Sequence, residues 1–351
     1  MPHHPSPPLT YRSAGVDRDH KDAILAGLGA RIRSTYAKGA LGSGDGFGGL
    51  FRLSGYRDPV LVSSIDGVGT KVQVAGLADR WRVVGADIVA HGANDVVCQG
   101  ATPLFMLDYI AAARLSTKVV SEIIAGVAAA CREQRITLIG GETAEMPGVY
   151  VREGCDVVGC TVGAVERGRM ITGEAIRPGD VVVGVASDGL HTNGYSLARA
   201  ALLPAGKVAA RLALDRTPAG LSESLGGALL RPHRPYARPV LALRRHVEIR
   251  GIAHVTGGGI PGNLARILPA RRRAVLHRHR WPVPPVFALI QERGKVADDE
   301  MFRTFNMGLG LLLAVPGEQG EPAVAHLHRL GERAWIVGTI TAGPRGVHLD
   351  A

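Results

Sequence analysis

Residues 63–71 read SSIDGVGTK and follow an apolar run, so a carboxylate, two glycines, a threonine and a lysine gather after a predicted strand. Glycine-rich turns after strands are common, which makes a simple turn the first interpretation. Backbone N–H groups freed by glycine, together with a lysine, also bind anions such as phosphate. The motif is not a Walker phosphate loop, because Val72 follows Lys71 and the glycine spacing differs. The candidate contacts in this stretch are Asp66, Gly67, Gly69, Thr70 and Lys71.

Further oxygen ligands lie in three other segments. Asp95 follows Asn94 inside an apolar helical stretch, Glu142 comes directly after a predicted strand, and Asp45 stands in a glycine-rich loop. An aspartate on an apolar helix face is costly to bury unless it is paired or bound to a metal. Each acid taken alone favours a structural role. Together with Asp66, they form a set of hard ligands suited to a Mg2+ that bridges nucleotide phosphates.

The glycine-rich loop itself, GALGSGDGFGGLF, covers residues 39–51. Its spacing is similar to a dinucleotide-binding fingerprint, but the predicted strand follows the loop instead of preceding it. A dinucleotide site is therefore excluded, while contact with another nucleotide stays open. The glycines concerned are Gly44, Gly46, Gly48 and Gly49.

The second half of the chain offers a different set of polar groups. His191 and Asn193 lie where a predicted strand meets a helix, and a histidine there is as well suited to acid, base or phosphate chemistry as to a structural role. Gly258 and Gly259 belong to a run of glycines before a helix whose N-terminus suits a phosphate. Arg303 lies shortly before another glycine-punctuated apolar strand.

Strands and helices alternate along both halves and predict an α+β fold with α/β layers. A turn-rich stretch at 167–180 indicates a boundary near residue 168. We therefore predict a disordered arm over 1–10, an N-terminal domain over 11–168 and a C-terminal domain over 169–351. In the first half we expect helices over 17–37, 81–98 and 116–133, and strands ending at 66 and over 103–112, 136–142 and 156–166. In the second half we expect a strand over 181–187 and helices near 194–203, 221–230, 235–247 and 262–268.

Composition excludes several classes of function. The net charge of +10 comes from arginines spread along the chain and not interleaved with aromatic residues, so nucleic acid is not the expected partner. No apolar run approaches a membrane span. The four cysteines show no paired spacing, which fits the reducing cytoplasm.

Taken in order, these segments resemble one family, the aminoimidazole ribonucleotide synthetases, also called phosphoribosylformylglycinamidine cyclo-ligases. This family belongs to a superfamily shared with selenophosphate synthetase and thiamine-phosphate kinase. Each segment alone is a weak signal, whereas eight in the right order are a strong one. They are YRSAGVD, GFGGLF, DGVGTK, NDVVCQGATPLFMLDY, GGETAEMPGVY, GLHTNGYSLAR, HVTGGG and EMFRTFNMGLG.

The resemblance implies a homodimer in which the first domains of two subunits pair their sheets into a β-barrel. It implies that ATP binds together with Mg2+ along the glycine loop and the dimer interface. K+ is a further candidate ion. The substrate would be a phosphoribosyl small molecule, formylglycinamidine ribonucleotide. ATP would activate its formamide oxygen as an iminophosphate, and the ring-forming nitrogen would then expel phosphate to give aminoimidazole ribonucleotide.

Carried onto this chain, the resemblance implies roles for particular residues. Metal ligands would be Asp66, Asp95 and Glu142, with Asp45 as an additional candidate. Nucleotide contacts would come from the glycines of both loops and from Thr70, Lys71, Asn94, Asp95 and Glu142. Catalytic candidates are Asp66, Lys71 and His191. We infer that the substrate is held by His191, Asn193, Gly258, Gly259 and Arg303.

Departures from the family pattern leave the ligand set open. Asp188 and Thr192 stand where many relatives carry serine, and Asp45 resembles the acidic loop of thiamine-phosphate kinases. Selenophosphate synthetases carry a reactive residue in the N-terminal loop, whereas the first cysteine here is Cys98. Related carbamoyl dehydratases end in a cysteine, whereas this sequence ends VHLDA. Selenophosphate synthetases and carbamoyl dehydratases both tend to carry Asp where this chain has His254. A catalytically silent nucleotide-binding module is a further alternative, and a dimeric scaffold is the weakest.

Overall fold

The computed structural model describes residues 8–42 and 46–350. Most of the predicted N-terminal arm, and both Gly44 and Asp45, lie outside the described residues. None of the helices within the described ranges is long and apolar enough to cross a membrane.

The N-terminal segment forms two short helices, α1 (Arg18–Ala26) and α2 (Gly29–Arg33). The expectation of one helix over 17–37 was therefore wrong. Helix α1 ends at Gly27, whose N–H bonds back to the carbonyls of Ala23 and Leu25, and α2 begins after Leu28. The short strands β1 (Ala40–Leu41) and β2 (Leu50–Phe51) then pair antiparallel on either side of the glycine-rich loop.

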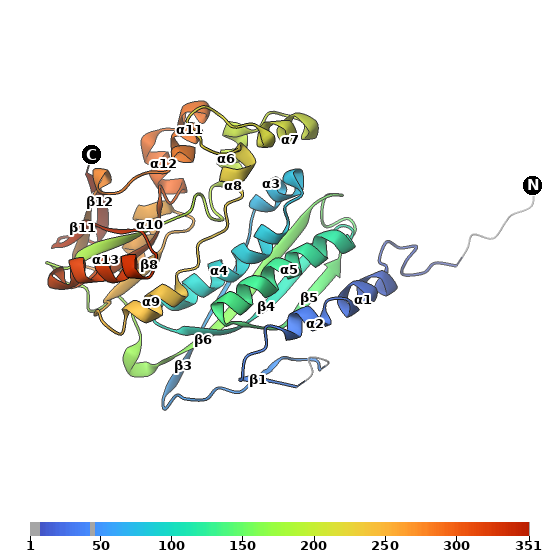
Figure 1. The fold of residues 1–351 in the computed structure, drawn as a ribbon, viewed down its shortest axis with the longest axis horizontal. Helices are drawn as coiled ribbons and strands as arrows, with labels where there is room; N and C mark the ends of the chain where they lie inside the picture. Colours follow the sequence, from blue (N-terminus) through green and yellow to red (C-terminus); the bar gives the residue numbers. More distant parts are fainter. Residues whose placement is uncertain (1–7, 43–45, 351) are drawn as a thin grey trace, which may run out of the picture.

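The first half is built on a four-stranded sheet in the order β3-β6-β4-β5. Strands β4 and β5 are parallel, and the other neighbours are antiparallel. Helices α4 and α5 lie side by side across one face of this sheet (Figure 1). Ser116 caps α5 by accepting a hydrogen bond from the N–H of Val119. The elements are β3 (Pro59–Gly67), α3 (Lys71–Ala78), α4 (Arg82–Cys98), β4 (Thr102–Ala112), α5 (Thr117–Gln134), β5 (Thr137–Glu145) and β6 (Cys155–Glu166).

The other face of this sheet is covered only in part, because Phe51 packs on Phe105 of β4 while the β3 side carries exposed residues. Strand β3 alternates between exposed and half-buried residues, and the exposed side includes apolar Leu61 and Ile65, which are 63% and 70% exposed. Leu107 of β4 adds to the same kind of surface at 37%. A strand with apolar side chains on both faces is typical of a sheet whose two faces are both covered.

The second half is built on a six-stranded sheet in the order β12-β9-β11-β7-β10-β8. All neighbours are antiparallel except β12 and β9. Every residue of β8 and β10 is buried, so both faces of this end of the sheet are covered within one chain, whereas β9, β11 and β12 keep some exposed residues. The strands are β7 (Val181–Ala186), β8 (Gly251–His254), β9 (Arg272–His277), β10 (Leu309–Val315), β11 (Ala334–Ala342) and β12 (Gly346–Asp350).

The helices of the second half lie around this sheet and against α3 and α4 (Figure 1). The predicted helices over 221–230 and 235–247 are shorter than expected, and the last of those predicted begins earlier, at Gly259. The helices are α6 (Tyr195–Leu202), α7 (Lys207–Asp215), α8 (Leu225–Leu229), α9 (Ala237–Leu243), α10 (Gly259–Ile267), α11 (Pro285–Gly294), α12 (Asp298–Thr304) and α13 (Gly320–Arg329), with 3-10 turns at Arg167–Arg169, Arg278–Arg280 and Gly317–Gln319. Mixed layers of helices and sheets confirm the predicted α+β class.

Candidate active site

The site is built on one polar stripe of α4. Asp87, His91 and Asp95 recur every four residues, and this spacing places them on the same side of an otherwise apolar helix. Asp87 and His91 are buried, and Asp95 is partly exposed. The stripe faces the end of β3 and several turns of the second half. It therefore lies where the two halves of the chain meet.

Asp66, at the end of β3, pairs with this stripe. Its Oδ2 lies 3.0 Å from Nε2 of His91, and its side chain is 47% exposed. Partial burial opposes ionisation of Asp66, but the hydrogen bond and charge of His91 outweigh it and lower the pKa of the carboxyl. Burial also opposes a charge on His91, yet Asp66, Asp95 and Asp87 raise its pKa above the usual value. Asp66 is thus an ionised carboxylate with access to solvent.

Asp95 is held by partners from both halves of the chain. Its Oδ1 lies 2.7 Å from Nδ1 of His254 at the end of β8, and its Oδ2 accepts a 2.7 Å hydrogen bond from Ser64 of β3. Burial raises the pKa of Asp95, but the contacts with His254, His91 and Ser64 prevail and lower it to about 2. Asp95 and Asp66 are therefore brought to the same place, as the sequence predicted for metal ligands.

His191 enters the site in an unusual backbone conformation. Its φ of 62° lies in the left-handed region, which a residue with a side chain adopts only at some cost. Gly310 of β10 makes room, because a Cβ there would lie 2.5 Å from Cε1 of His191. The ring is buried and stacks on His233 with centroids 4.0 Å apart. Burial, and then nearby positive charges, lower the pKa of His191 well below its usual value, so the imidazole is neutral.

Lys71 does not face the carboxylates of Asp66 and Asp95. Its ammonium is fully buried, lies 2.7 Å from Oδ2 of Asp87 and donates to the carbonyl of Arg231. In this arrangement it cannot touch a bound phosphate, contrary to the expectation from its motif. The physical reason is that α3 begins at Lys71, which turns the side chain inward beneath the loop.

Asn94 is likewise fully occupied. Its amide donates to the carbonyl of Arg234 at 2.9 Å, and its oxygen accepts from the N–H of Tyr236 at 2.7 Å. Asp87 accepts from the N–H of His233 at 2.7 Å. Lys71, Asp87 and Asn94 therefore anchor the backbone of residues 231–236, hereafter the 231–236 segment.

The loop between Asp66 and α3 closes over the second half. Gly69 has a φ of 67°, and a Cβ there would lie 3.9 Å from the carbonyl of Thr192. The hydroxyl of Thr70 lies 3.2 Å from that of Ser196 at the start of α6. Ser196 in turn lines a cavity of about 1100 Å3, together with Gln73 and Trp81 among others. Gly67 and Gly69 thus lie beside the site, as expected.

The residues predicted for the substrate side also come together. A Cβ on Gly257 would lie 3.4 Å from Oδ1 of Asn193, which places the 257–259 turn beside the turn of His191. Gly258 has a φ of 93°, and Gly259 packs against the carbonyl of Phe302, directly before Arg303. Arg303 is exposed. The N-terminus of α10, Asn193 and Arg303 therefore share one region.

Glu142 and the glycine loop are not part of this cluster within one chain. Glu142 lies on β5, at the opposite sheet edge from β3, and pairs with Lys21 at 2.6 Å. Two strands separate it from Asp66, a distance of roughly 14 Å at the usual strand spacing. Gly49 packs against Ile139 on the same β5 edge, and the described glycines Gly46 and Gly48 are exposed beside it.

Sequence reasoning missed His91, His233 and Asp87. The four-residue spacing of Asp87, His91 and Asp95 was a usable signal for the first two members of the stripe. His233 lies in an irregular segment, where no periodicity marks it. Its position becomes apparent only once the fold brings it within 2.9 Å of His254, from Nε2 to Nε2.

Comparison with known proteins identifies the family of this chain. Residues 49–165 match the model of the AIR synthase related protein N-terminal domain, and residues 177–350 match the C-terminal domain. A phosphoribosylformylglycinamidine cyclo-ligase of Myxococcus xanthus is 49% identical over 95% of this chain and 96% of its own length.

Solved structures show the same fold at lower identity. Thiamine-monophosphate kinase from Stenotrophomonas maltophilia is 21% identical with a TM-score of 0.68, covering 92% of this chain and 95% of that one. The hydrogenase maturation protein HypE in complex with ATP is 19% identical with a TM-score of 0.62, covering 93% of this chain and 87% of that one. The relative from Myxococcus xanthus, nearly half identical over almost the whole chain, decides the assignment. The chain belongs to the phosphoribosylformylglycinamidine cyclo-ligase family.

Proposed function

We propose that this chain catalyses the ATP-dependent ring closure of formylglycinamidine ribonucleotide to aminoimidazole ribonucleotide, with release of ADP and phosphate. The observation that carries the proposal is the meeting of Asp66, Asp95 and His191 at the junction of the two halves, in a chain that matches cyclo-ligases nearly end to end. ATP use is also supported by the structural likeness to a protein solved with ATP.

Asp66 is the best-placed ligand for Mg2+. It is ionised and its side chain is 47% exposed, against 28% for Asp95, although both oxygens of each carboxylate already have a partner within the chain. A bound Mg2+ would supply charge neutralisation at the phosphates of ATP. Asp95 would then orient the site from behind, through His254 and Ser64. A requirement for K+ would be tested by measuring ADP release with and without K+.

His191 is our proposed proton acceptor. Its imidazole is neutral because burial lowers its pKa, and its Nδ1 has no hydrogen-bond partner among the described residues. In the reaction, the formamide oxygen attacks the γ-phosphorus of ATP and ADP leaves. The ring-forming nitrogen then attacks the activated carbon, phosphate departs with the oxygen, and the nitrogen loses a proton. A neutral base beside the attacking nitrogen accelerates that step.

The substrate fits the second half of the site. The N-terminus of α10 with Gly258 and Gly259, the side chain of Asn193 and the guanidinium of Arg303 offer donors for its phosphate. The cavity of about 1100 Å3 that Ser196 lines is large enough for a ribonucleotide, but none of these substrate-side residues lines it.

We further propose that the chain acts as a cytoplasmic homodimer. The open face of the four-stranded sheet exposes Leu61, Ile65 and Leu107, a surface that a second copy would cover. Glu142 and the glycine loop lie on the β5 edge, away from Asp66. Pairing of two such sheets offers a way to bring the β5 edge of one copy to the Asp66 of the other, which would complete the predicted ligand set.

The test is ADP release by the purified chain, measured with and without formylglycinamidine ribonucleotide. We expect release to depend on that substrate and to match formation of aminoimidazole ribonucleotide. ADP release that ignores the substrate would refute the assignment.

A variant pair sharpens the test. His191→Ala should lose far more turnover than ATP affinity. A collapse of ATP binding would instead place His191 in the nucleotide site. His326→Ala, at a partly exposed position of α13, serves as the matched control and should behave as wild type.

A further inference from the structure

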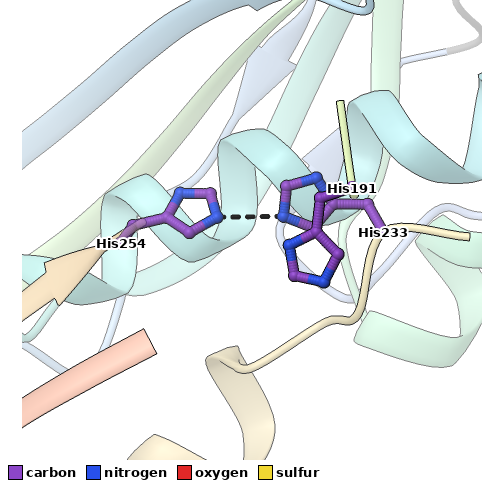
Figure 2. Close-up of side chains that lie close together, drawn as sticks. All are labelled: His191, His233 and His254. Atoms are coloured by element: carbon purple, nitrogen blue, oxygen red, sulfur yellow. Dashed lines mark hydrogen bonds between the residues drawn. The ribbon is translucent and has the colours of Figure 1, made fainter. Parts of the chain in front are cut away.

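Three buried histidines converge from separate parts of the second half. His191 comes from the turn after β7, His233 from the 231–236 segment and His254 from the end of β8 (Figure 2). Their exposed fractions are 1%, 1% and 6%. One ring nitrogen of each lies within 4.8 Å of the corresponding nitrogens of the other two. We call these residues the three-histidine cluster.

Two of the rings are fixed from outside the cluster. Nδ1 of His254 lies 2.7 Å from Oδ1 of Asp95, and Nδ1 of His233 lies 3.3 Å from the hydroxyl of Thr192. Both rings therefore turn Nε2 inward, and these two atoms lie 2.9 Å apart (Figure 2). A carboxylate that holds the outer nitrogen of a histidine is the usual support for a metal-binding imidazole.

His191 supplies the third imidazole. Its Nδ1 is buried and has no hydrogen-bond partner within the described part of the chain. A buried polar atom without a partner costs about 1–3 kcal/mol, so a site that leaves one open is poised to accept a ligand. The left-handed backbone at His191 adds to the cost of keeping the ring here.

The charge state of the cluster also favours a cation. Burial is the main cause that lowers the pKa of each of the three histidines, so the rings are neutral and keep their lone pairs. Neutral imidazole is the form that binds first-row transition metals, whereas Mg2+ prefers oxygen. Asp66 and Asp95 lie nearby and would offset the charge of a dication.

We propose that His191, His233 and His254 form a binding site for a transition-metal dication of the Zn2+ or Co2+ type, separate from the Mg2+ that accompanies ATP. The nitrogens of His233 and His254 would separate from 2.9 Å to about 3.3 Å, the spacing in a tetrahedral site with bonds of about 2.0–2.1 Å. His191 would turn out of its stack on His233, and a water would take the fourth position. Since His191 is also our proposed proton acceptor, the bound metal would inhibit turnover.

The experiment is a Co2+ titration of the metal-stripped full chain, followed by visible absorption. We expect the bands of tetrahedral, nitrogen-ligated cobalt to saturate at one ion per chain, and Zn2+ to bleach them. Turnover should fall over the same range of Zn2+ concentration. Absence of these bands in the wild-type chain would overturn the proposal without any variant. Metal binding that leaves turnover unchanged would instead refute His191 as the proton acceptor, and it would leave standing the metal site that the cobalt bands establish.

Variants then locate the site. His233→Asn should weaken Co2+ binding by more than about 100-fold, and Thr192→Val, which removes the outer partner that His233 shares with His91, by about 10–100-fold. His326→Asn is the matched control, because His326 pairs with His246 at the surface with ring centroids 4.5 Å apart. Equal binding by wild type and His233→Asn would show that the cluster is held by hydrogen bonds alone. Equal loss in His326→Asn would mean surface binding.

Discussion

The two sheets of this chain are covered to different degrees. The six-stranded sheet buries every residue of β8 and β10, whereas the four-stranded sheet has helices on one face and exposed leucine and isoleucine on the other. A sheet covered on both faces can fold within one chain, but one with an apolar open face is complete only when something covers it. The sheet of the second half is thus covered within one chain, whereas the open face of the first sheet has the character of a protein interface.

The largest expected effect is in the covered sheet. Leu311→Asp would place an unpaired carboxylate at a fully buried position of β10. Burying such a charge and losing the apolar contact together should destabilise the chain by at least about 5 kcal/mol. Urea unfolding, or loss of folded protein on expression, measures this. A variant with wild-type stability would show that this sheet is less completely covered than it appears.

The covered face of the first sheet offers a pH-dependent test. Asp108 lies there on β4, and burial raises its pKa from 3.8 to about 7. The folded chain therefore holds a proton on Asp108 where the unfolded chain has lost it, between pH of about 4 and 7. Stability is fully present below this window and falls as the pH rises through it, by roughly 4 kcal/mol in total.

Asp108→Asn should remove that loss, so the variant should be more stable than wild type at pH 8. Thermal melting from pH 5 to 8 measures the difference, although acid unfolding of other groups sets the lower limit. Asp19→Asn, on an exposed helix turn, is the control and should leave the pH profile unchanged. If the melting temperatures of wild type and Asp108→Asn change with pH in the same way, the buried Asp108 is not the cause of the loss of stability.

A third test compares one carboxylate from each half. Asp180 pairs with Arg250, both almost completely buried, so Asp180→Asn should cost about 3 kcal/mol of stability and leave kcat of the folded chain unchanged. Asp66 is half-exposed, so Asp66→Asn should lower kcat by about 100-fold through lost metal contact, with little change in melting temperature. Steady-state kinetics and melting curves of both variants decide between the roles. An unaffected kcat in Asp66→Asn would remove Asp66 from the metal site.

The smallest effect on stability is expected on the open face. Leu61→Asp changes a residue that is 63% exposed, so the free energy of unfolding of one chain should change by less than about 1 kcal/mol. The same change should convert a dimer to a monomer, which light scattering would detect. Val208→Asp on α7, exposed at 75% but away from the sheet, is the matched control. A dimer that survives Leu61→Asp would show that the open face is not its interface.

Sequence reasoning succeeded where local signals were strong. The strand before Asp66 and the long helices α4 and α5 were predicted from the spacing of their apolar residues. It also brought Asp66, Asp95 and His191 into one site, because motif order in a known family carries information that periodicity does not.

It failed where the outcome depends on long-range packing. Lys71 looked like a phosphate ligand from its motif, but the buried partner Asp87 lies sixteen residues away and could be matched to it only through the fold. Glu142 looked like a ligand beside Asp66, but strand order places the two at opposite edges of a sheet. His233 carried no signal at all, because its importance comes from contacts with His191 and His254.

The anchoring of the 231–236 segment has a mechanical consequence. Lys71, Asp87 and Asn94 of the first half form hydrogen bonds with this stretch of backbone. If the two halves rotated apart at this point, these buried hydrogen bonds would break. Each group left unsatisfied would cost about 1–3 kcal/mol. Movement that admits and releases ligands is therefore expected at the opposite rim, where the exposed ion pair of Lys207 with Glu153 joins α7 to the loop before β6. We therefore expect the 231–236 segment to keep its place while ligands enter and leave on the side of α7.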